Sequence, residues 1–453
     1  AWCGLQPHES PANPGKFGPY RQSERKALYT PYAEQLVEQG HAYYAFDTPE
    51  ELERMRQNFK TEANPSPTYD GTTRLQMRNS LTLTPQETET LLANGTPRVV
   101  RIKMPHNQNI EFADMIRGSI SFNSSMVDDK VLLKADGMPT YHLAVVVDDY
   151  LMEITHAFRG EEWLSSAPVH VLLWQYLGWQ QHMPQWAHLP LILGPDGAKL
   201  SKRHGNKYGF PIFAMNWTDP SKSELTEGFK ERGFLPEAFI NLLALMGWND
   251  GTGQEIFSKA AMAAAFDMSR VHSAGAQFDY EKAKWYNQEW IKRLADTDLA
   301  ERLKRFDEGR FGHINQELLG KVVGLVKERC HLLTDFWNQA SFFFQPPETF
   351  DTNAIAPKWT SEKTAFFQAL LKDWGAAEQW EPSEIEQRFK NLANTHLLKP
   401  GELMLPLRIM LVGGKFGPGV FDVATMVGQP ETLRRIEHVL QLLFTANAST
   451  EMV

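Results

Sequence analysis

The residues best suited to chemistry in this chain lie in one basic, glycine-flanked segment between Asp196 and Lys207. It sets four cations against one carboxylate in a chain whose formal net charge is −9, and these cations are Lys199, Lys202, Arg203 and Lys207. Ser201 places a small hydroxyl between the two central lysines. Ammonium and backbone N–H groups of such a loop can bind a polyphosphate and stabilise the charge that develops on a leaving pyrophosphate. A solvated basic turn is the alternative, and charge alone does not separate the two.

The elements expected to position this segment are those of an α/β domain. A continuous apolar run, Tyr141–Val147, predicts a strand buried on both faces. A second strand over 154–158, a helix over 167–177 and a third strand over 189–193 are also predicted, and the third leads directly into the basic segment. Open α/β sheets bind nucleotides at the carboxyl ends of their strands. The pattern therefore predicts a nucleotide site at the basic segment.

The rest of the chain is predicted to be mostly helical. Thr48 and Thr84 each open a capping box with proline at the first helical position, so a helix is expected to begin after each. Strands are expected over 43–46 and 98–104. Further helices are predicted over 236–247, 258–266, 280–294, 316–336, 358–371, 381–393 and 431–443. The glycine-rich stretch 413–419 lacks the spacing of a phosphate-binding loop and predicts a turn between helices.

Composition excludes several classes of protein. No apolar run is long enough for a membrane span, so no membrane partner is expected. Two cysteines are too few for a four-thiolate zinc site or a disulfide framework, and they fit a reducing cytoplasm. We therefore expect a cytoplasmic protein without structural zinc. The net charge of −9 argues against a nonspecific nucleic-acid binder but leaves room for local basic faces.

The basic segment also carries a resemblance. Residues 199–203, Lys-Leu-Ser-Lys-Arg, resemble the KMSKS loop of class I aminoacyl-tRNA synthetases. Further segments resemble glutamyl-tRNA synthetases in family order, namely 18–25, 136–142, 147–149, 154–156, 159–163, 233–238, 278–280 and 406–408. A single KMSKS-like pentapeptide is a weak signal, but the ordered set covers nearly the whole chain.

The resemblance implies a fold class and a division into domains. It implies an α/β Rossmann-type class I catalytic domain, incomplete at its N-terminus, with an inserted acceptor-binding α+β subdomain. All-α stem-contact and anticodon-binding domains would follow. The corresponding boundaries are 1–40 and 131–207 for the two parts of the catalytic domain, 41–130 for the insertion, 208–300 for the stem-contact domain and 301–453 for the anticodon-binding domain.

The activity implied by the resemblance is that of a glutamate–tRNA ligase. Such an enzyme activates L-glutamate with ATP to form glutamyl-adenylate, releasing pyrophosphate, and passes the acyl group to the terminal adenosine of tRNA(Glu). ATP with Mg²⁺, L-glutamate and tRNA(Glu) are therefore the expected partners, and a monomer is the expected state.

Roles for individual residues are likewise carried over by motif. Lys202 would stabilise the transition-state phosphates and Lys199 would assist, while Arg203 would help to bind the ATP. Ser201 and backbone amides would shape the loop. Glu162 and the backbone of Ile192 and Leu193 would lie at the adenosine. Arg159 would bind a substrate carboxylate, Tyr141 would hydrogen-bond the glutamate, and Trp163 would form a wall of the pocket. The structural alternatives are that Tyr141 and Trp163 are core aromatics and that Arg159 belongs to a structural ion pair.

Two departures from the family pattern bear on activity. Val145 stands where some members have an asparagine able to contact the substrate. The family's HIGH motif precedes the segment that resembles residues 2–5, so the 453-residue chain as written is expected to be inactive or badly impaired, and a His-x-Gly-His pattern is expected upstream. Two alternatives remain open: a catalytically incomplete tRNA-binding paralogue, and a glutaminyl-tRNA synthetase, whose C-terminal part is a β-barrel rather than helical.

Overall fold

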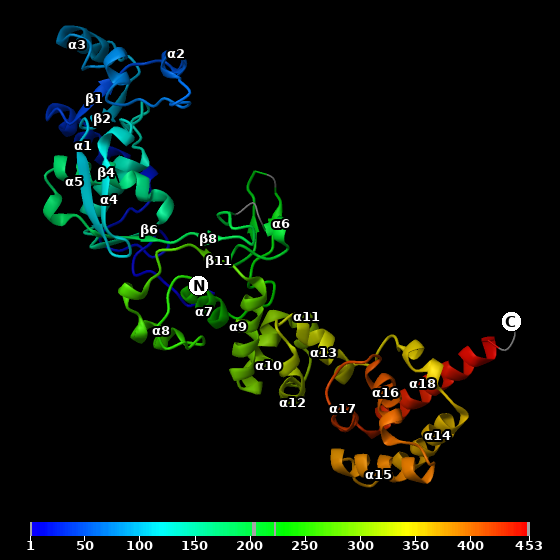
Figure 1. The fold of residues 1–453 in the computed structure, drawn as a ribbon. Coiled ribbons are helices and arrows are strands. Elements are labelled where there is room, and N and C mark those ends of the chain that lie inside the picture. Colours follow the sequence, from blue (N-terminus) through cyan, green and yellow to red (C-terminus); the bar gives the residue numbers. More distant parts are fainter. Residues whose placement is uncertain (1, 202–204, 222, 451–453) are drawn as a thin grey trace. The chain divides into compact units, whose positions relative to one another are not determined.

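Both predicted capping boxes are present in the computed structural model, which describes residues 2–201, 205–221 and 223–450 (Figure 1). Thr48 Oγ1 accepts a hydrogen bond from the Glu51 N–H at 3.3 Å, and the Glu51 carboxylate accepts one from the Thr48 N–H at 2.7 Å. The same reciprocal pair joins Thr84 and Glu87. These bonds satisfy otherwise free N–H groups at the starts of α2 (Pro49–Phe59) and α3 (Pro85–Ala93).

The described chain divides into two units, of which the first comprises residues 3–200 and 243–278. Besides α2 and α3, its helices are α1 (Lys26–Glu38), α4 (Tyr141–Leu151), α5 (Ala167–Tyr176) and α8 (Lys259–Ala265). Its strands are β1 (Ala42–Ala45), β2 (Val99–Ile102), β3 (Asn109–Asp114), β4 (Gly118–Asn123), β5 (Val131–Leu133), β6 (His156–Gly160), β7 (Gln185–Leu189), β8 (Ile192–Leu193) and β11 (Ala276–Gln277).

The sheet that positions the candidate site has the order β4-β3-β7-β6. β6 pairs in parallel with β7, so that Arg159 lies opposite His188, and β7 pairs in parallel with β3. Three more strands form the sheet β1-β2-β5, and β8 pairs in parallel with β11. A buried core shared by α1, α4, α5 and the strands fixes this arrangement, with the side chains of Trp174 and Trp186 almost fully buried.

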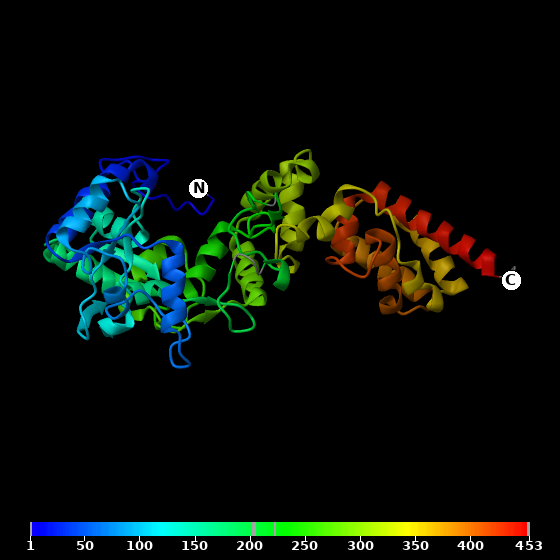
Figure 2. The same ribbon diagram turned by 90° about the horizontal axis from the view of Figure 1, so that it is seen from above.

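The second unit comprises residues 201–242 and the chain from Asp279 onward. Its helices are α6 (Gly205–Tyr208), α9 (Tyr280–Arg293), α10 (Asp296–Phe306), α11 (Glu308–Phe311), α12 (Gln316–Val326), α13 (Asp335–Phe344), α14 (Ser361–Gly375), α15 (Pro382–Thr395), α16 (Pro400–Val412), α17 (Val420–Val427) and α18 (Gln429–Thr450). Two short strands, β9 (Trp217–Thr218) and β10 (Leu225–Thr226), form a hairpin, and α7 (Pro236–Leu245) spans the boundary of the units. Figure 2 shows α14 alongside α18, and these helices enclose an apolar core.

The predicted strand over Tyr141–Val147 is wrong, because these residues form the first two turns of the helix α4. Leu143, Ala144, Val146 and Val147 are all buried, as the continuous apolar run required. Such a run is compatible with a buried helix as well as with a buried strand, and its length alone does not decide between them. As a helix, α4 places Tyr141 in its first turn and Asp149 in its last.

Two further predicted elements have different limits in the structure. The strand expected over 189–193 is interrupted at Pro190, so that β7 ends at Leu189 and β8 begins at Ile192. The helix expected over 316–336 ends at Val326, and a new helix, α13, begins at Asp335. The Asp335 carboxylate accepts the N–H groups of His331 and Leu332, both at 2.9 Å, and so stabilises the break between the two helices.

The helix α16 was not predicted, because prolines at positions 400 and 406 obscured it. Pro400 occupies the first turn, where a missing N–H costs nothing, and Pro406 is accommodated in a buried helix interior. The turn predicted over 413–419 is confirmed and joins α16 to α17. Gly413 begins it with a φ of +84°, and a Cβ there would lie 2.6 Å from the carbonyl oxygen of Thr349. A side chain at this position would be both strained and obstructed.

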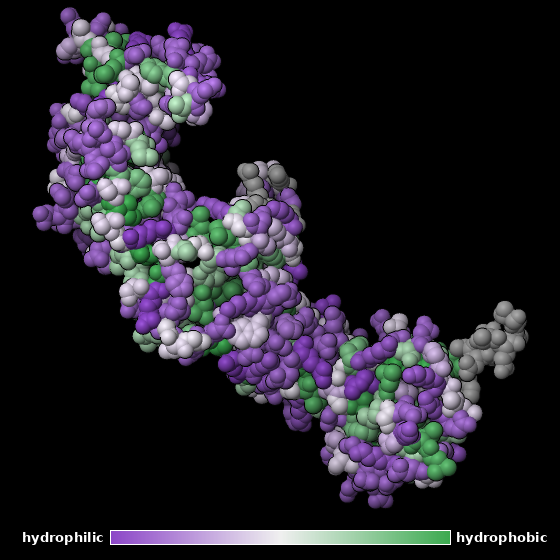
Figure 3. Space-filling view, viewed as in Figure 1, coloured by the Kyte–Doolittle hydropathy of each residue, from purple (hydrophilic) through white to green (hydrophobic). Residues whose placement is uncertain are grey.

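The face of the protein in Figure 3 is predominantly hydrophilic. Within the described ranges, no helix combines the length and apolar character needed to cross a bilayer. The five-part division into domains given above stays a prediction.

Candidate active site

The aromatic side chains of Tyr141 and Trp163 lie against each other in the first unit. Tyr141 is in the first turn of α4, and Trp163 is in the short 3₁₀ helix Glu161–Ser166 that follows β6. Their ring centroids are 4.3 Å apart. Tyr141 is 36% exposed and Trp163 is 39% exposed, whereas the core residues Trp174 and Trp186 are at most 1% exposed. The pair therefore presents an aromatic surface to solvent.

Arg159 is buried on β6 and makes two polar contacts. Its Nη2 lies 3.3 Å from the Asp149 carboxylate, in the last turn of α4, and its Nη1 lies 2.9 Å from Nδ1 of His170 on α5. Burial raises the pKa of Asp149 to about 6, against the opposing effect of the Arg159 charge. The structural ion pair considered as an alternative is thus present. Among the described residues, these contacts engage two of the five guanidinium N–H groups.

Two histidines, His170 and His142, also lie beside Arg159, and neither was predicted from the sequence. His170 is fully buried, and its Nε2 lies 3.2 Å from Nδ1 of His142. Burial holds the pKa of His170 well below its usual value and lowers that of His142 to about 4. His170 lies inside an apolar helix, where a lone histidine carries no sequence signal of function. His142, next to Tyr141, lies in the segment 136–142 that resembles the family, and no role was predicted for it.

Lys199 lies opposite Leu193 in a tight hairpin formed by residues 192–200. The Leu200 N–H donates to the Ile192 carbonyl at 2.8 Å, and the Gly194 N–H donates to the Ala198 carbonyl at 2.8 Å. The hairpin presents the Lys199 ammonium to the Glu162 carboxylate at 2.8 Å. This hydrogen bond lowers the pKa of Glu162 and so favours the ionised carboxylate.

The structure brings seven of the ten predicted site residues into the first unit. Arg159, Glu162 and Trp163 lie at the carboxyl end of β6, Tyr141 packs on Trp163, and Lys199 reaches Glu162. Ile192 and Leu193 form β8, which precedes the hairpin turn. Ser201 is half-buried and belongs to the second unit, and Lys202 and Arg203 lie outside the described residues.

Val145 occupies the second turn of α4, four residues after Tyr141. Residues four apart on a helix share a face, so Val145 presents methyl groups on the side of the helix that carries Tyr141. Val145 therefore cannot make the hydrogen bond to the substrate that an asparagine could make at this position.

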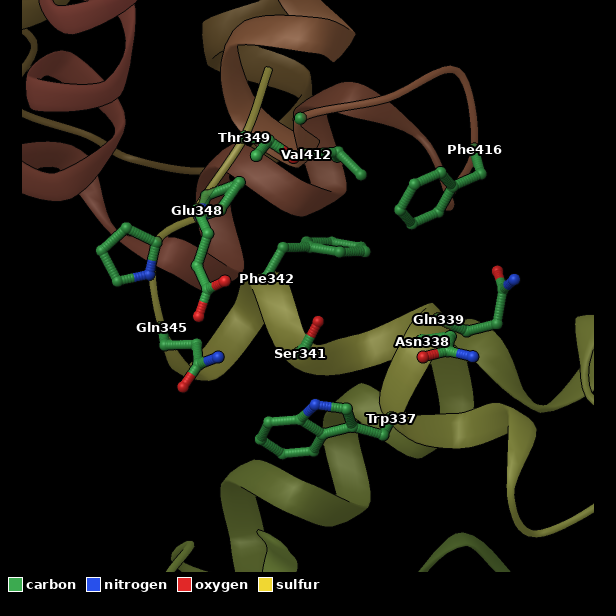
Figure 4. A pocket seen from close by; sticks show the side chains of 13 residues that line it. Trp337, Asn338, Gln339, Ser341, Phe342, Gln345, Glu348, Thr349, Val412 and Phe416 are labelled. Atoms are coloured by element: carbon green, nitrogen blue, oxygen red, sulfur yellow. The ribbon is translucent and has the colours of Figure 1, made fainter. Parts of the chain in front are cut away.

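A separate cavity of about 600 Å³ lies within the second unit. Figure 4 shows the aromatic side chains of Trp337, Phe342 and Phe416 around it, together with the amides of Asn338, Gln339 and Gln345. The turn after α16 forms one side, and Arg408 stabilises that turn by donating to the carbonyl oxygens of residues 416, 417 and 418 at 3.1, 3.0 and 2.6 Å. Phe416 remains 43% exposed.

The cluster around Arg159 and the cavity at Trp337 lie in parts of the chain that match two known protein families. Residues 1–285 match the model for class I tRNA synthetases (E and Q), catalytic domain, and residues 281–440 match the model for an anticodon binding domain. A glutamate–tRNA ligase from Amoebophilus asiaticus is 44% identical over 443 residues, covering 98% of this chain and 86% of the relative. One from Cytophaga hutchinsonii is also 44% identical, over 97% of this chain and 86% of the relative.

A solved structure agrees with these relatives. The crystal structure of a glutamate tRNA ligase from Elizabethkingia meningosepticum, in complex with its amino acid, superposes with a TM-score of 0.92 at 42% identity. It covers 98% of this chain and 88% of that chain.

This chain belongs to the glutamate–tRNA ligase family.

Membership confirms the predicted fold class and the predicted activity, and it favours the ligase over the two alternatives. The glutaminyl alternative also predicted a C-terminal β-barrel, whereas the part of the second unit after Asp279 that the structure describes contains helices and no strand. As a class I glutamate–tRNA ligase the protein uses ATP, glutamate and tRNA.

Proposed function

We propose that Arg159, Tyr141 and Trp163 bind glutamate and that Glu162 and Lys199 lie at the ATP in a ligase specific for tRNA(Glu). One observation carries the proposal: a buried guanidinium, two solvent-facing aromatic rings and an exposed lysine–glutamate pair gather at the end of one strand. This combination provides a cation for a carboxylate, a wall for an aliphatic chain and a second cation for phosphate.

The reaction then proceeds in two balanced steps. A carboxylate oxygen of glutamate attacks the α-phosphorus of ATP, and the bond to pyrophosphate breaks. A ribose hydroxyl of the terminal adenosine of tRNA next attacks the acyl carbon, so that AMP leaves and the hydroxyl proton is transferred away. Arg159 would hold the glutamate side chain during both steps, which orients the attacking carboxylate without taking part in bond formation.

Lys199 would change partners when ATP binds. Its pair with Glu162 has half-exposed side chains on both sides, 51% and 40%, and exposed pairs contribute little to stability. The ammonium can therefore move to the phosphates at small cost, while Glu162 stays near the adenosine. Lys202, with Ser201 and Arg203, would stabilise the departing pyrophosphate, and the backbone of Ile192 and Leu193 would support the base.

Mg²⁺ is proposed to arrive with the triphosphate. The described residues contain no group of three or more His, Cys, Asp or Glu able to hold a metal ion. Mg²⁺ commonly keeps several waters and binds through substrate phosphates, so the triphosphate would supply most of its ligands. When bound, it would neutralise phosphate charge.

The direct test is amino-acid specificity. The complete gene product, given ATP and tRNA(Glu), is expected to form glutamyl-tRNA and to leave glutamine uncharged, as measured by acid-gel separation of labelled tRNA. Charging of glutamine in place of glutamate would contradict the proposal.

A monomer is proposed for the free enzyme, and light scattering measures the molar mass that tests this.

The cavity at Trp337 and Phe416 is proposed to receive an unstacked base of the tRNA. It lies within the residues that match an anticodon binding domain, and aromatic rings beside amides are suited to stack and hydrogen-bond a single-stranded base.

We expect Phe416→Ala to weaken tRNA affinity by about tenfold, since base stacking on an aromatic contributes about 1–3 kcal/mol. Phe416→Tyr should bind tRNA like the parent. Fluorescence titration with tRNA(Glu) measures both, and equal affinities for the two variants would exclude the stacking.

Binding of tRNA is expected to weaken steeply with salt in spite of the net charge of −9. Each phosphate contact releases counterions and contributes about −0.7 to −0.9 to the slope of log K against log salt. Filter binding across a salt series measures this slope. A flat response would contradict an extended phosphate-binding surface.

A further inference from the structure

The contacts of Arg159 fix the orientation of its guanidinium from two sides. His170 on α5 contacts Nη1 at 2.9 Å, and Asp149 on α4 contacts Nη2 at 3.3 Å. The guanidinium carbon lies 5.7 Å from the centre of the Trp186 ring on β7. Because a guanidinium is planar, contacts at both terminal nitrogens determine the direction in which its other N–H groups point.

The contact with His170 also has a defined direction. A guanidinium has only donors, so Nδ1 of His170 must accept and cannot carry a proton. In a neutral imidazole the proton is then on Nε2, which lies 3.2 Å from Nδ1 of His142. That nitrogen must accept in turn, so His142 also carries its proton on Nε2. Arg159, His170 and His142 therefore form a chain of hydrogen bonds with a single direction.

The surroundings keep both histidines neutral. His170 is fully buried among the residues of α5, and its neighbours include Arg159, His142 and His188. His142 lies near Lys130 and Asp128. A proton added to His170 would place an N–H against an N–H of Arg159, and burial opposes that charge.

We propose that His170, supported by His142, is a positioning residue for glutamate binding: it sets the plane of the Arg159 guanidinium through a directional hydrogen-bond chain. The inference rests on the proposed role of Arg159 in binding a glutamate carboxylate. The chain also reaches the aromatic wall, because the Tyr141 ring packs on His170 with centroids 5.7 Å apart and Tyr141 precedes His142. One histidine thus orients the cation and supports the ring beside it.

Two substitutions of His170 separate positioning from packing. His170→Asn places an amide oxygen at the position of Nδ1 and keeps the acceptor for Arg159. His170→Gln places its amide near the position of Nε2 and loses that acceptor. Because loss of this acceptor removes a hydrogen bond to a charged group, we expect His170→Gln to raise the KM for glutamate by about tenfold or more. The KM for ATP should stay near the parent value, and His170→Asn should stay near the parent in both.

The outcomes are distinguishable. Equal KM values for glutamate in His170→Asn and His170→Gln would overturn the positioning role, because both remove the imidazole but only one removes the acceptor. If Arg159→Lys leaves the KM for glutamate unchanged, the proposed function of Arg159 fails instead. An independent measurement uses the unaltered enzyme: ¹⁵N NMR of histidine-labelled protein should show His170 protonated at Nε2 and bare at Nδ1. A proton on Nδ1 would overturn the chain even if neither variant folds.

Discussion

Replacement of Arg159 by glutamine is expected to raise the KM for glutamate by about 100-fold, because charge-assisted hydrogen bonds to a carboxylate contribute about 1.5–3 kcal/mol each. The kcat should fall less, since the residue holds the substrate side chain rather than the reacting atoms. Steady-state aminoacylation with ATP and tRNA saturating measures the two constants separately. If Arg159→Gln lowered kcat but left the KM for glutamate unchanged, Arg159 would not be a glutamate-binding residue.

The same substitution is expected to destabilise the fold, and the loss should depend on pH. Asp149 then loses its partner, and breaking a buried ion pair costs about 3–5 kcal/mol. The pKa of Asp149 is already raised to about 6 beside Arg159, and it should rise further without that charge. Because the folded state then binds this proton more tightly than the unfolded state does, the unfolding free energy of the variant should fall as the pH rises from about 4, the ordinary pKa of an aspartate, through its raised folded-state pKa above 6.

A double variant controls for this effect. Asp149→Asn combined with Arg159→Gln replaces the pair with two neutral amides of similar size. Urea unfolding at pH 5.5 and pH 8 should show a smaller difference for the double variant than for Arg159→Gln alone. Glutamate binding should not recover, because the guanidinium is still missing. Recovery of both properties together would assign Arg159 a structural role only.

Elements encoded by local patterns could be predicted from the sequence, whereas those that depend on distant packing partners could not. Capping boxes at Thr48 and Thr84 predicted helix starts correctly, because both partners of each bond lie within four residues. The run at Tyr141–Val147 failed for the opposite reason. Its apolar residues report burial, and burial does not distinguish a helix from a strand when the packing partners, here α1 and α5, are distant in sequence.

In the candidate site too, some residues could be predicted from local motifs and others only from the fold. Arg159 and Lys199 could be proposed from short motifs, whereas the partners that orient Arg159 come from two other elements, α4 and α5. Asp149 belongs to the segment 147–149 that resembles the family but carried no predicted role, and His170 is one polar residue in an apolar helix. Their function depends on the pairing of β6 with β7 and on the packing of α4 and α5, which no local pattern encodes.

The second large effect is expected from Lys202→Ala. Removing a cation that acts on a leaving group costs about 10²–10³-fold in rate when the charge is needed mainly in the transition state. Adenylate formation should slow by this factor, while tRNA affinity should change little, because one lysine contributes only one of many phosphate contacts. Single-turnover release of pyrophosphate, with glutamate, ATP and tRNA present, measures the first, and fluorescence titration measures the second.

Lys207→Ala is the matched control, since Lys207 is a cation of the same basic segment that follows the KMSKS-like residues. Its ammonium lies 3.2 Å from the hydroxyl of Tyr208, on the short helix α6. If the segment acted only as a diffuse positive field, the two alanine variants would lose similar amounts of rate, and both losses would shrink at high salt. A loss confined to Lys202 and retained at high salt identifies a cation that contacts the departing pyrophosphate. If Lys202→Ala lost rate and tRNA affinity equally, Lys202 would instead be a residue that contacts the tRNA.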